Sequence, residues 1–221
     1  MIHYHTRSLR GGTRDMKKSI LILMTTVLAV SLFAQDEEET LLTGDITHGG
    51  FGGPVVKWTS VQKEFGVLVG GRGGWIINHA FSIGGGGYGL VNSIPPAENV
   101  DFGDWFFSEP VLGMGYGGFE MEAIIRSDQL VHSAIILLIG AGGVGYHEAW
   151  DSNWEEDDSH HQWDSFFILE PGINVELNVA AFFRLNAGAS YRFVSGVDKW
   201  GLSDSDIGGP AVTLTLKFGK F

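Results

Sequence analysis

Cysteine is absent from the 221-residue sequence. The chain can therefore form no disulfide bond and no thiolate metal site, and it offers no cysteine for a lipid anchor behind a leader peptide. Positive charge is scarce, because 14 lysines and arginines are outnumbered by 26 aspartates and glutamates. A chain this acidic is a poor partner for nucleic acid, whose phosphates it repels. The length predicts one domain after any processed leader.

Long apolar runs are also scarce, and the clearest one lies near the start of the chain. Met16-Lys17-Lys18 is basic, residues 20–33 form an apolar run of 14, and Ala34 precedes an acidic stretch. This order is that of a secretory signal peptide cleaved near Ala34, and the run is shorter than the roughly 20 residues of a membrane-spanning helix. We interpret residues 1–34 as an N-terminal extension followed by a signal peptide that is cleaved. The start codon is that of Met1 or of Met16. An uncleaved amphipathic anchor is the alternative.

Residues 1–34 hold five of the basic residues and one of the acidic residues. The remaining chain therefore has nine basic and 25 acidic residues, with a net charge of −16. No later apolar run is long enough for a spanning helix, so this part of the chain would cross a membrane as strands. We expect residues 35–48 to be a loose N-terminal segment and residues 49–221 to form the folded domain.

Alternation of apolar and polar residues predicts eight strands in the folded domain. The predicted strands cover residues 49–61, 65–77, 81–91, 111–125, 130–146, 166–175, 179–193 and 211–221. In the last of them, the apolar residues Val212, Leu214, Leu216 and Phe218 lie opposite the polar residues Thr213, Thr215 and Lys217. An even number of strands, each of about ten or more residues, is typical of a barrel that crosses a membrane.

The connections between the predicted strands alternate in length. Tight turns are expected near Asn78, Asp128 and Asn178. Long polar segments cover residues 92–110, 147–164 and 195–209. This alternation predicts an all-β fold, a closed antiparallel up-and-down transmembrane β-barrel, with the turns and both termini periplasmic and the long loops outside. The alternative is a soluble sandwich or lipocalin-like barrel, in which the apolar face points inward.

The closing strand ends the chain on Phe221 and resembles the closing strand of Gram-negative outer-membrane β-barrels. In that family a terminal phenylalanine, usually in phase with the lipid-facing residues, is read by the barrel assembly machinery. Phe218 is in phase here and Phe221 is not. Either Phe218 takes this role, or a β-bulge at Gly219-Lys220 restores the phase of Phe221.

As a pattern, the resemblance covers the whole chain after the leader. It is to small eight-stranded barrels of the outer-membrane protein X and outer-membrane protein A transmembrane-domain type. The resemblance implies a place in the bacterial outer membrane, among outer-membrane lipid and lipopolysaccharide. It also implies a structural or adhesion-like surface role toward an unknown extracellular partner, and a protein that is not an enzyme.

Charged residues on the polar faces of the strands form the first candidate site. We expect them to line the barrel lumen and to neutralise one another, because buried charges are tolerated when they are paired. The expected members are Arg72, Glu120, Glu122, Glu170, Arg184 and Arg192. A plug of ion pairs is the structural interpretation, and a narrow pore for ions or small solutes is the alternative.

The loop over residues 147–164 is the second candidate site. It holds seven carboxylates, three histidines and no basic residue. Clustered carboxylates suit weakly bound Ca²⁺ or Mg²⁺, but no regular ligand spacing is present, and a solvated acidic loop is the alternative. The candidate ligands are Glu155, Glu156, Asp157, Asp158, His160 and His161.

Two patterns that suggest catalysis lack the context they need. The run from Gly140 to Gly145 matches a dinucleotide-binding G-x-G-x-x-G, but an acidic, Trp-rich segment follows in place of a helix. A lipid-modifying barrel enzyme would need a serine and a histidine side by side. His132 and Ser133 are neighbours on a predicted strand, and neighbours point to opposite faces.

Overall fold

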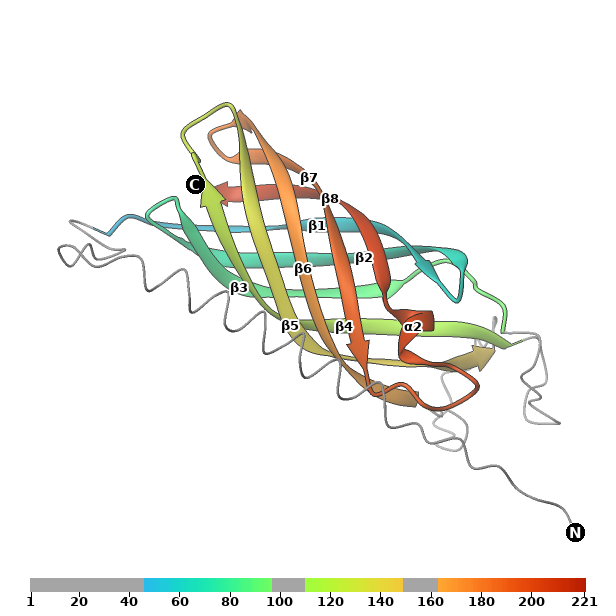
Figure 1. The fold of residues 1–221 in the computed structure, drawn as a ribbon. Helices are drawn as coiled ribbons and strands as arrows, with labels where there is room; N and C mark the ends of the chain where they lie inside the picture. The colour runs from blue at the N-terminus through green and yellow to red at the C-terminus, as the bar shows by residue number, and fades with distance from the viewer. Residues whose placement is uncertain (1–45, 97–109, 149–162) are drawn as a thin grey trace, which may run out of the picture. The chain divides into compact units, whose positions relative to one another are not determined.

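The computed structural model describes residues 46–96, 110–148 and 163–221, which form a closed barrel of eight strands (Figure 1). The strands are β1 (His48–Val61), β2 (Glu64–Ile77), β3 (Phe81–Leu90), β4 (Pro110–Ile125), β5 (Val131–Glu148), β6 (Trp163–Ala180), β7 (Phe183–Ser195) and β8 (Gly209–Lys220). Each strand pairs antiparallel with the next, and β8 pairs with β1. The predicted all-β, up-and-down fold is therefore confirmed.

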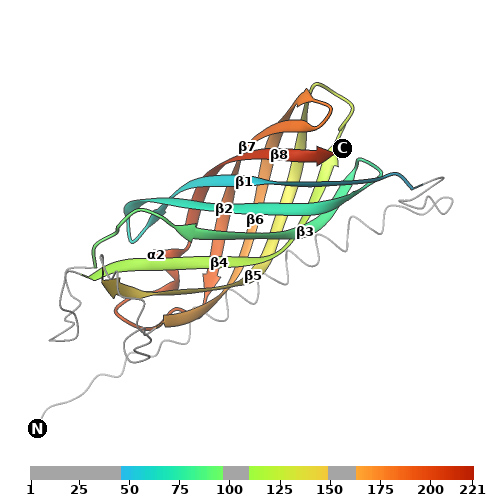
Figure 2. The same cartoon turned by 180° about the vertical axis from the view of Figure 1, so that it is seen from behind.

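The barrel has two different ends. The turn end holds the short connections after β2, β4 and β6, the start of β1 and the end of β8. The loop end holds the connections after β1, β3, β5 and β7, the last of which contains the short helix α2 (Asp204–Ile207). Figures 1 and 2 show the carboxy terminus and α2 at opposite ends. Among the described residues, no helix is long and apolar enough to cross a membrane.

Large apolar side chains cover the outward face, whereas the charged side chains of the barrel wall point inward, together with apolar residues such as Val55 and Leu138. Outward residues such as Ile173 and Phe65 are 67% and 64% exposed, whereas Lys217 and Arg192 in the interior are 1% and 0% exposed. This is the reverse of a soluble barrel, so the soluble alternative is wrong. Because side chains alternate along each strand, the whole pattern follows from the strand register.

The prediction was wrong at the junction between β6 and β7. A tight turn was expected near Asn178, but β6 continues to Ala180 and the turn lies at residues 181–182. Glu176 is consequently a strand residue, paired with Asn186 of β7 and turned into the lumen. The polar Glu-Leu-Asn sequence looks like a turn, but its residues keep the inward–outward alternation of β6. The first strand also begins at His48, one residue earlier than predicted.

The turn after β2 lies where it was predicted. Asn78 and His79 have φ angles of 50° and 54°, which is the left-handed conformation of a tight hairpin turn. In addition, the Asn78 Oδ1 atom accepts a 2.9 Å hydrogen bond from the Thr47 amide. Asparagine tolerates this backbone conformation because its short polar side chain bonds locally.

Glycines allow the strands to approach closely inside the barrel wall. A Cβ atom at Gly53 of β1 would lie 1.7 Å from the Leu216 carbonyl oxygen of β8. At Gly87, which points outward from β3, the nearest atom would be 4.0 Å away. Only the inward glycine is therefore required by the packing of the barrel itself.

Candidate functional site: the barrel lumen

The loop end of the lumen is closed by apolar side chains. Seven buried residues from the strands and the loop-end connections gather there: Val61, Ile94, Leu112, Val144, Val197, Leu202 and Ile207. The β7–β8 connection is held in place by Arg192, whose Nε donates a 2.8 Å hydrogen bond to the Ile207 carbonyl oxygen. The Gln62 amide donates a 2.7 Å bond to the Asp206 carbonyl oxygen. The loop end is therefore a packed apolar layer.

Beneath this layer, Lys57 and Glu170 form the first buried ion pair. Their Nζ and Oε1 atoms are 2.8 Å apart. Glu170 also accepts hydrogen bonds from the Tyr116 hydroxyl at 2.7 Å and the Ser190 hydroxyl at 2.6 Å. The Lys57 ammonium lies 3.7 Å from the ring centroid of Tyr88, a cation–π distance.

Arg72 joins two carboxylates of β4 in the middle of the lumen. Its Nε lies 2.7 Å from Glu120 Oε2, and its Nη2 lies 3.3 Å from Glu122 Oε2. Glu120 also accepts a 2.5 Å hydrogen bond from the Tyr88 hydroxyl. Since Tyr88 also contacts the Lys57 ammonium, the first ion pair and the Arg72 cluster form one network.

Lys217 of β8 extends the network toward the turn end. Its ammonium lies 2.8 Å from both carboxylate oxygens of Glu122 and also contacts Glu176. Glu176 accepts a 2.8 Å hydrogen bond from the Asn186 amide and pairs with Arg184 at 3.6 Å. The His132 Nε2 atom is 3.2 Å from the same carboxylate.

Each carboxylate in this network has more than one partner, so each charge keeps at least one neighbour if another is lost. Leaving a buried charge without a partner costs about 3–5 kcal/mol. The charged side chains share the lumen with buried apolar side chains such as Leu68, Leu138 and Ile168. A cavity between Lys57 and Thr213 has a volume of about 20 Å³, which is room for about one water molecule.

All six charged residues of the first candidate site lie in the lumen. The structure brings Arg72, Glu120 and Glu122 together, as ion pairs require. Arg192 lies apart from them, since its described contacts are the Ile207 carbonyl, the Thr59 hydroxyl and the ring of Tyr116.

Sequence reasoning missed three members of the network, Lys57, Glu176 and Lys217, and its two tyrosines. The two lysines alternate with outward apolar neighbours, so the phase of their strands already indicated an inward position. The tyrosines carried no comparable signal, because a tyrosine is compatible with either face.

At the turn end, a second apolar cluster closes the lumen. It consists of Phe51, Ile76 and Ile124, with Phe221 packed against it. The Phe221 ring centroid lies 4.1 Å from the guanidinium carbon of Arg184. The network is thus enclosed between two apolar layers.

The two phenylalanines of the predicted assembly signal, at the end of β8, point to opposite faces of the barrel wall. The β8 register with β1 is regular from Val212 to Lys220, so the alternative of a β-bulge at Gly219-Lys220 does not hold. Phe218 points outward, 46% exposed, and stacks on Phe183 with ring centroids 4.9 Å apart. Recognition of either phenylalanine by assembly machinery stays a prediction.

The remaining candidate residues give no catalytic arrangement within the described chain. The candidate cation ligands between Glu155 and His161 lie outside the described residues. His132 points into the lumen toward Glu176, while Ser133 points outward. The glycines from Gly140 to Gly145 lie within strand β5, and the next described element is strand β6, not a helix.

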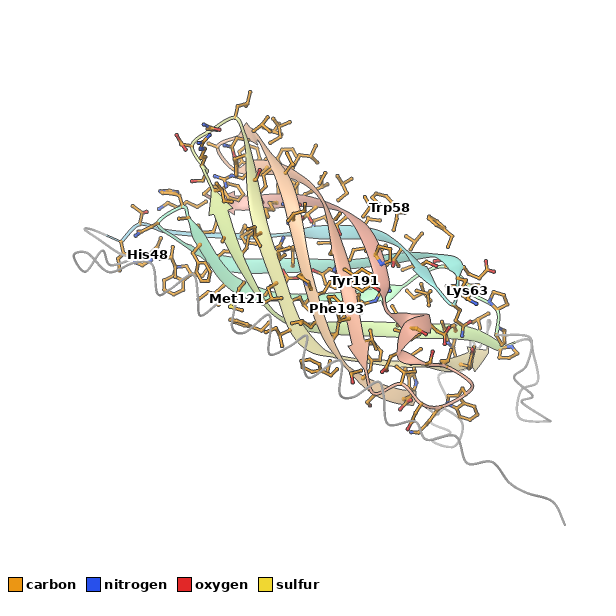
Figure 3. All side chains as sticks on the ribbon, in the orientation of Figure 1. His48, Trp58, Lys63, Met121, Tyr191 and Phe193 are labelled. Carbon is orange, nitrogen blue, oxygen red and sulfur yellow. The ribbon has the colours of Figure 1, made fainter. Side chains whose placement is uncertain are left out.

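The outward surface forms an apolar band. Among the described residues, every charged residue lies in the lumen or at one end of the barrel. Figure 3 shows Trp58 projecting from the wall, with His48 at the turn end and Lys63 at the loop end. The rings of Tyr191 and Phe193 are 4.7 Å apart on the outward face of β7.

The fold and the lumen together define a class, the eight-stranded up-and-down barrel with a filled, ion-paired interior. Solved structures of similar fold include Neisserial surface protein A, with a TM-score of 0.53 and 11% identity over 80% of this chain and 100% of that one. Ail, the attachment invasion locus protein of Yersinia pestis, has a TM-score of 0.45 and 11% identity over 80% of this chain and 99% of that one. The outer membrane protease OmpT of Escherichia coli has a TM-score of 0.30 and 8% identity over 83% and 98%.

No protein-family model and no curated protein sequence matches this chain. The likeness to Neisserial surface protein A is thus one of fold. It agrees with the resemblance to small outer-membrane barrels that the sequence pattern indicated.

Proposed function

We propose that this protein is a bacterial outer-membrane β-barrel with a structural or adhesion-like role at the cell surface. The observation that carries the proposal is the uncharged apolar band around a lumen of paired charges. Lipid stabilises outward apolar side chains, and a charge in the middle of such a band costs about 2–4 kcal/mol. In water this arrangement would be unfavourable, because the outward apolar side chains would stay hydrated. Soluble barrels instead bury their apolar face.

The filled lumen argues against the alternative of a narrow pore. A conducting path needs a continuous polar channel, whereas an apolar cluster lies at each end of this network. The cavity of about 20 Å³ lies between these clusters and is too small to form a path by itself. No described group favours the lipid-modifying enzyme, which stays the third candidate.

Recognition is assigned to the loop end. The sequence places a net charge of −13 in residues 92–110, 147–164 and 195–209, together with five of the seven tryptophans. Aromatic side chains among charges are typical of recognition surfaces. Lipopolysaccharide is anionic, so Ca²⁺ or Mg²⁺ bound weakly by Glu155 to Asp158 and by His160 and His161 would relieve the repulsion.

Single-cysteine labelling on intact cells tests both location and orientation. The chain has no cysteine of its own, so Asp198→Cys at the loop end and Asp128→Cys at the turn end each provide one exposed thiol. A membrane-impermeant reagent should label the loop-end thiol on intact cells and the turn-end thiol only after lysis. Labelling of the turn-end thiol alone would contradict the orientation, and recovery of the folded protein in the soluble fraction would contradict the membrane location.

A further inference from the structure

The last residue of the chain leaves the barrel wall and turns toward the lumen. Strand β8 ends at Lys220, whose side chain is exposed, and Phe221 follows it as a partly buried residue. A further strand residue in the β8 register would point inward, opposite to Phe218 and Lys220. The inward position of Phe221 therefore follows from an uninterrupted alternation along β8.

Phe221 packs against the apolar cluster at the turn end of the lumen network. Beneath it are Phe51, Ile76 and Ile124, contributed by three different strands at the turn end. At its edge is Arg184, which pairs with Glu176. A cation held 4.1 Å from a ring centroid is attracted by the electrons of the ring face, and this contact holds the ring of Phe221 beside Arg184.

The arrangement has a consequence for the ion pairs below. Glu176 and Lys217 are 0% and 1% exposed, although both belong to the turn-end half of the network. Water reaching them would screen their attraction, since the interaction of two charges weakens as the surrounding dielectric rises. An apolar lid at this end keeps the pairs in a dry environment.

We infer that Phe221 and the three residues beneath it form a seal that closes the turn end of the lumen to water and small solutes. The terminal aromatic thus has a role inside the barrel, and Phe218 supplies the aromatic ring on the outward face of β8. The seal is complete only when β8 has paired with both β1 and β7, because Phe221 follows the last residue of β8. This inference rests on the barrel interior and is independent of the membrane assignment.

A buried thiol reports on the seal. Ser82 is 3% exposed, lies directly across from Ile76 in the β2–β3 register, and donates a 3.3 Å hydrogen bond to Glu122 of the network. Ser82→Cys changes one atom, and its thiol is the only one in the chain. The rate of its reaction with iodoacetamide in the folded protein measures access from the turn end.

In this background, Phe221→Ala should accelerate the reaction at least tenfold, because it removes the ring over the cluster. Phe218→Ala is the matched control: it removes an aromatic from the same strand on the outward face and should leave the rate unchanged. Equal rates in the parent and the Phe221→Ala protein, or equal acceleration by both variants, would overturn the inference.

If the Phe221→Ala protein does not fold, Ile124→Ala replaces it. This variant opens the floor of the same cluster and leaves the chain end intact, so the seal predicts faster reaction here too. A rate equal to that of the parent would overturn the inference. Retention of the heat-sensitive folded band on unboiled gels shows that each tested variant is folded.

Discussion

Lys217 is the residue on which the lumen network depends most directly. Its ammonium contacts both Glu122 and Glu176, and its side chain is almost completely buried. Lys217→Met keeps most of the side-chain length and removes the charge. The two carboxylates then face each other across the site without the cation between them.

The magnitude follows from the partners that remain. Glu122 keeps Arg72 at 3.3 Å, and Glu176 keeps Arg184 at 3.6 Å. Because neither carboxylate is left alone, we expect a loss at the lower end of the range for a broken buried pair, about 3 kcal/mol. Lys217→Met combined with Glu122→Gln removes one of the two facing charges and should lose less than Lys217→Met alone.

Equilibrium unfolding in guanidinium chloride, with the barrel folded into lipid vesicles and followed by tryptophan fluorescence, measures the change. Lys220→Met is the matched control, since Lys220 is an exposed lysine of the same strand. Its substitution should change the free energy of unfolding by no more than about 0.5 kcal/mol. Equal losses in the two lysine variants would refute the assignment of Lys217 as a central cation of the network.

Three further outcomes are expected. Ile173→Arg, in the outward band, should lower the unfolding free energy in vesicles by about 2–4 kcal/mol, and an unchanged value would argue against a lipid-facing band. Gly53→Ala should prevent folding or lower stability strongly, while the outward Gly87→Ala should fold normally. Parallel refolding measures the yield of folded protein for each variant, and equal yields would contradict this prediction. Millimolar Ca²⁺ should change the tryptophan fluorescence of the folded protein, and neutralising residues 155–158 should abolish the change. A response that survives neutralisation would show that calcium binds elsewhere on the protein.

Periodicity predicted the strands well because each strand has one face in a different environment from the other. The inward position of Arg72 and Glu120 needed only the phase of β2 and β4. Glu176 was missed because polar residues near a strand end look like a turn, and phase alone does not tell where a strand stops. The structure ends β6 four residues beyond Glu176.

The partners in the network could not be predicted from the sequence. Lys57 and Glu170 are 113 positions apart, and Lys217 and Glu122 are 95 apart. Which inward residues meet across the lumen depends on the stagger of all eight strands around the barrel. Alternation within one strand carries no information on that stagger, so the lumen was predicted as a plug of ion pairs without saying which residues pair.

The distribution of basic residues links the interior of the barrel to its outer rim. Of the nine lysines and arginines after residue 34, five lie in the lumen, and Arg126 and Lys220 lie at the turn end. Lys63 and Lys199 remain at the loop end, where Lys199 lies 3.7 Å from Asp164. The protein therefore keeps most of its positive charge in the lumen, where four of the five cations pair with buried carboxylates, and leaves the acidic loop segments with little counter-charge of their own. We therefore expect a partner at this end to bring cations, either as metal ions or as its own basic groups, and a fluorescence response in the calcium titration would favour metal ions.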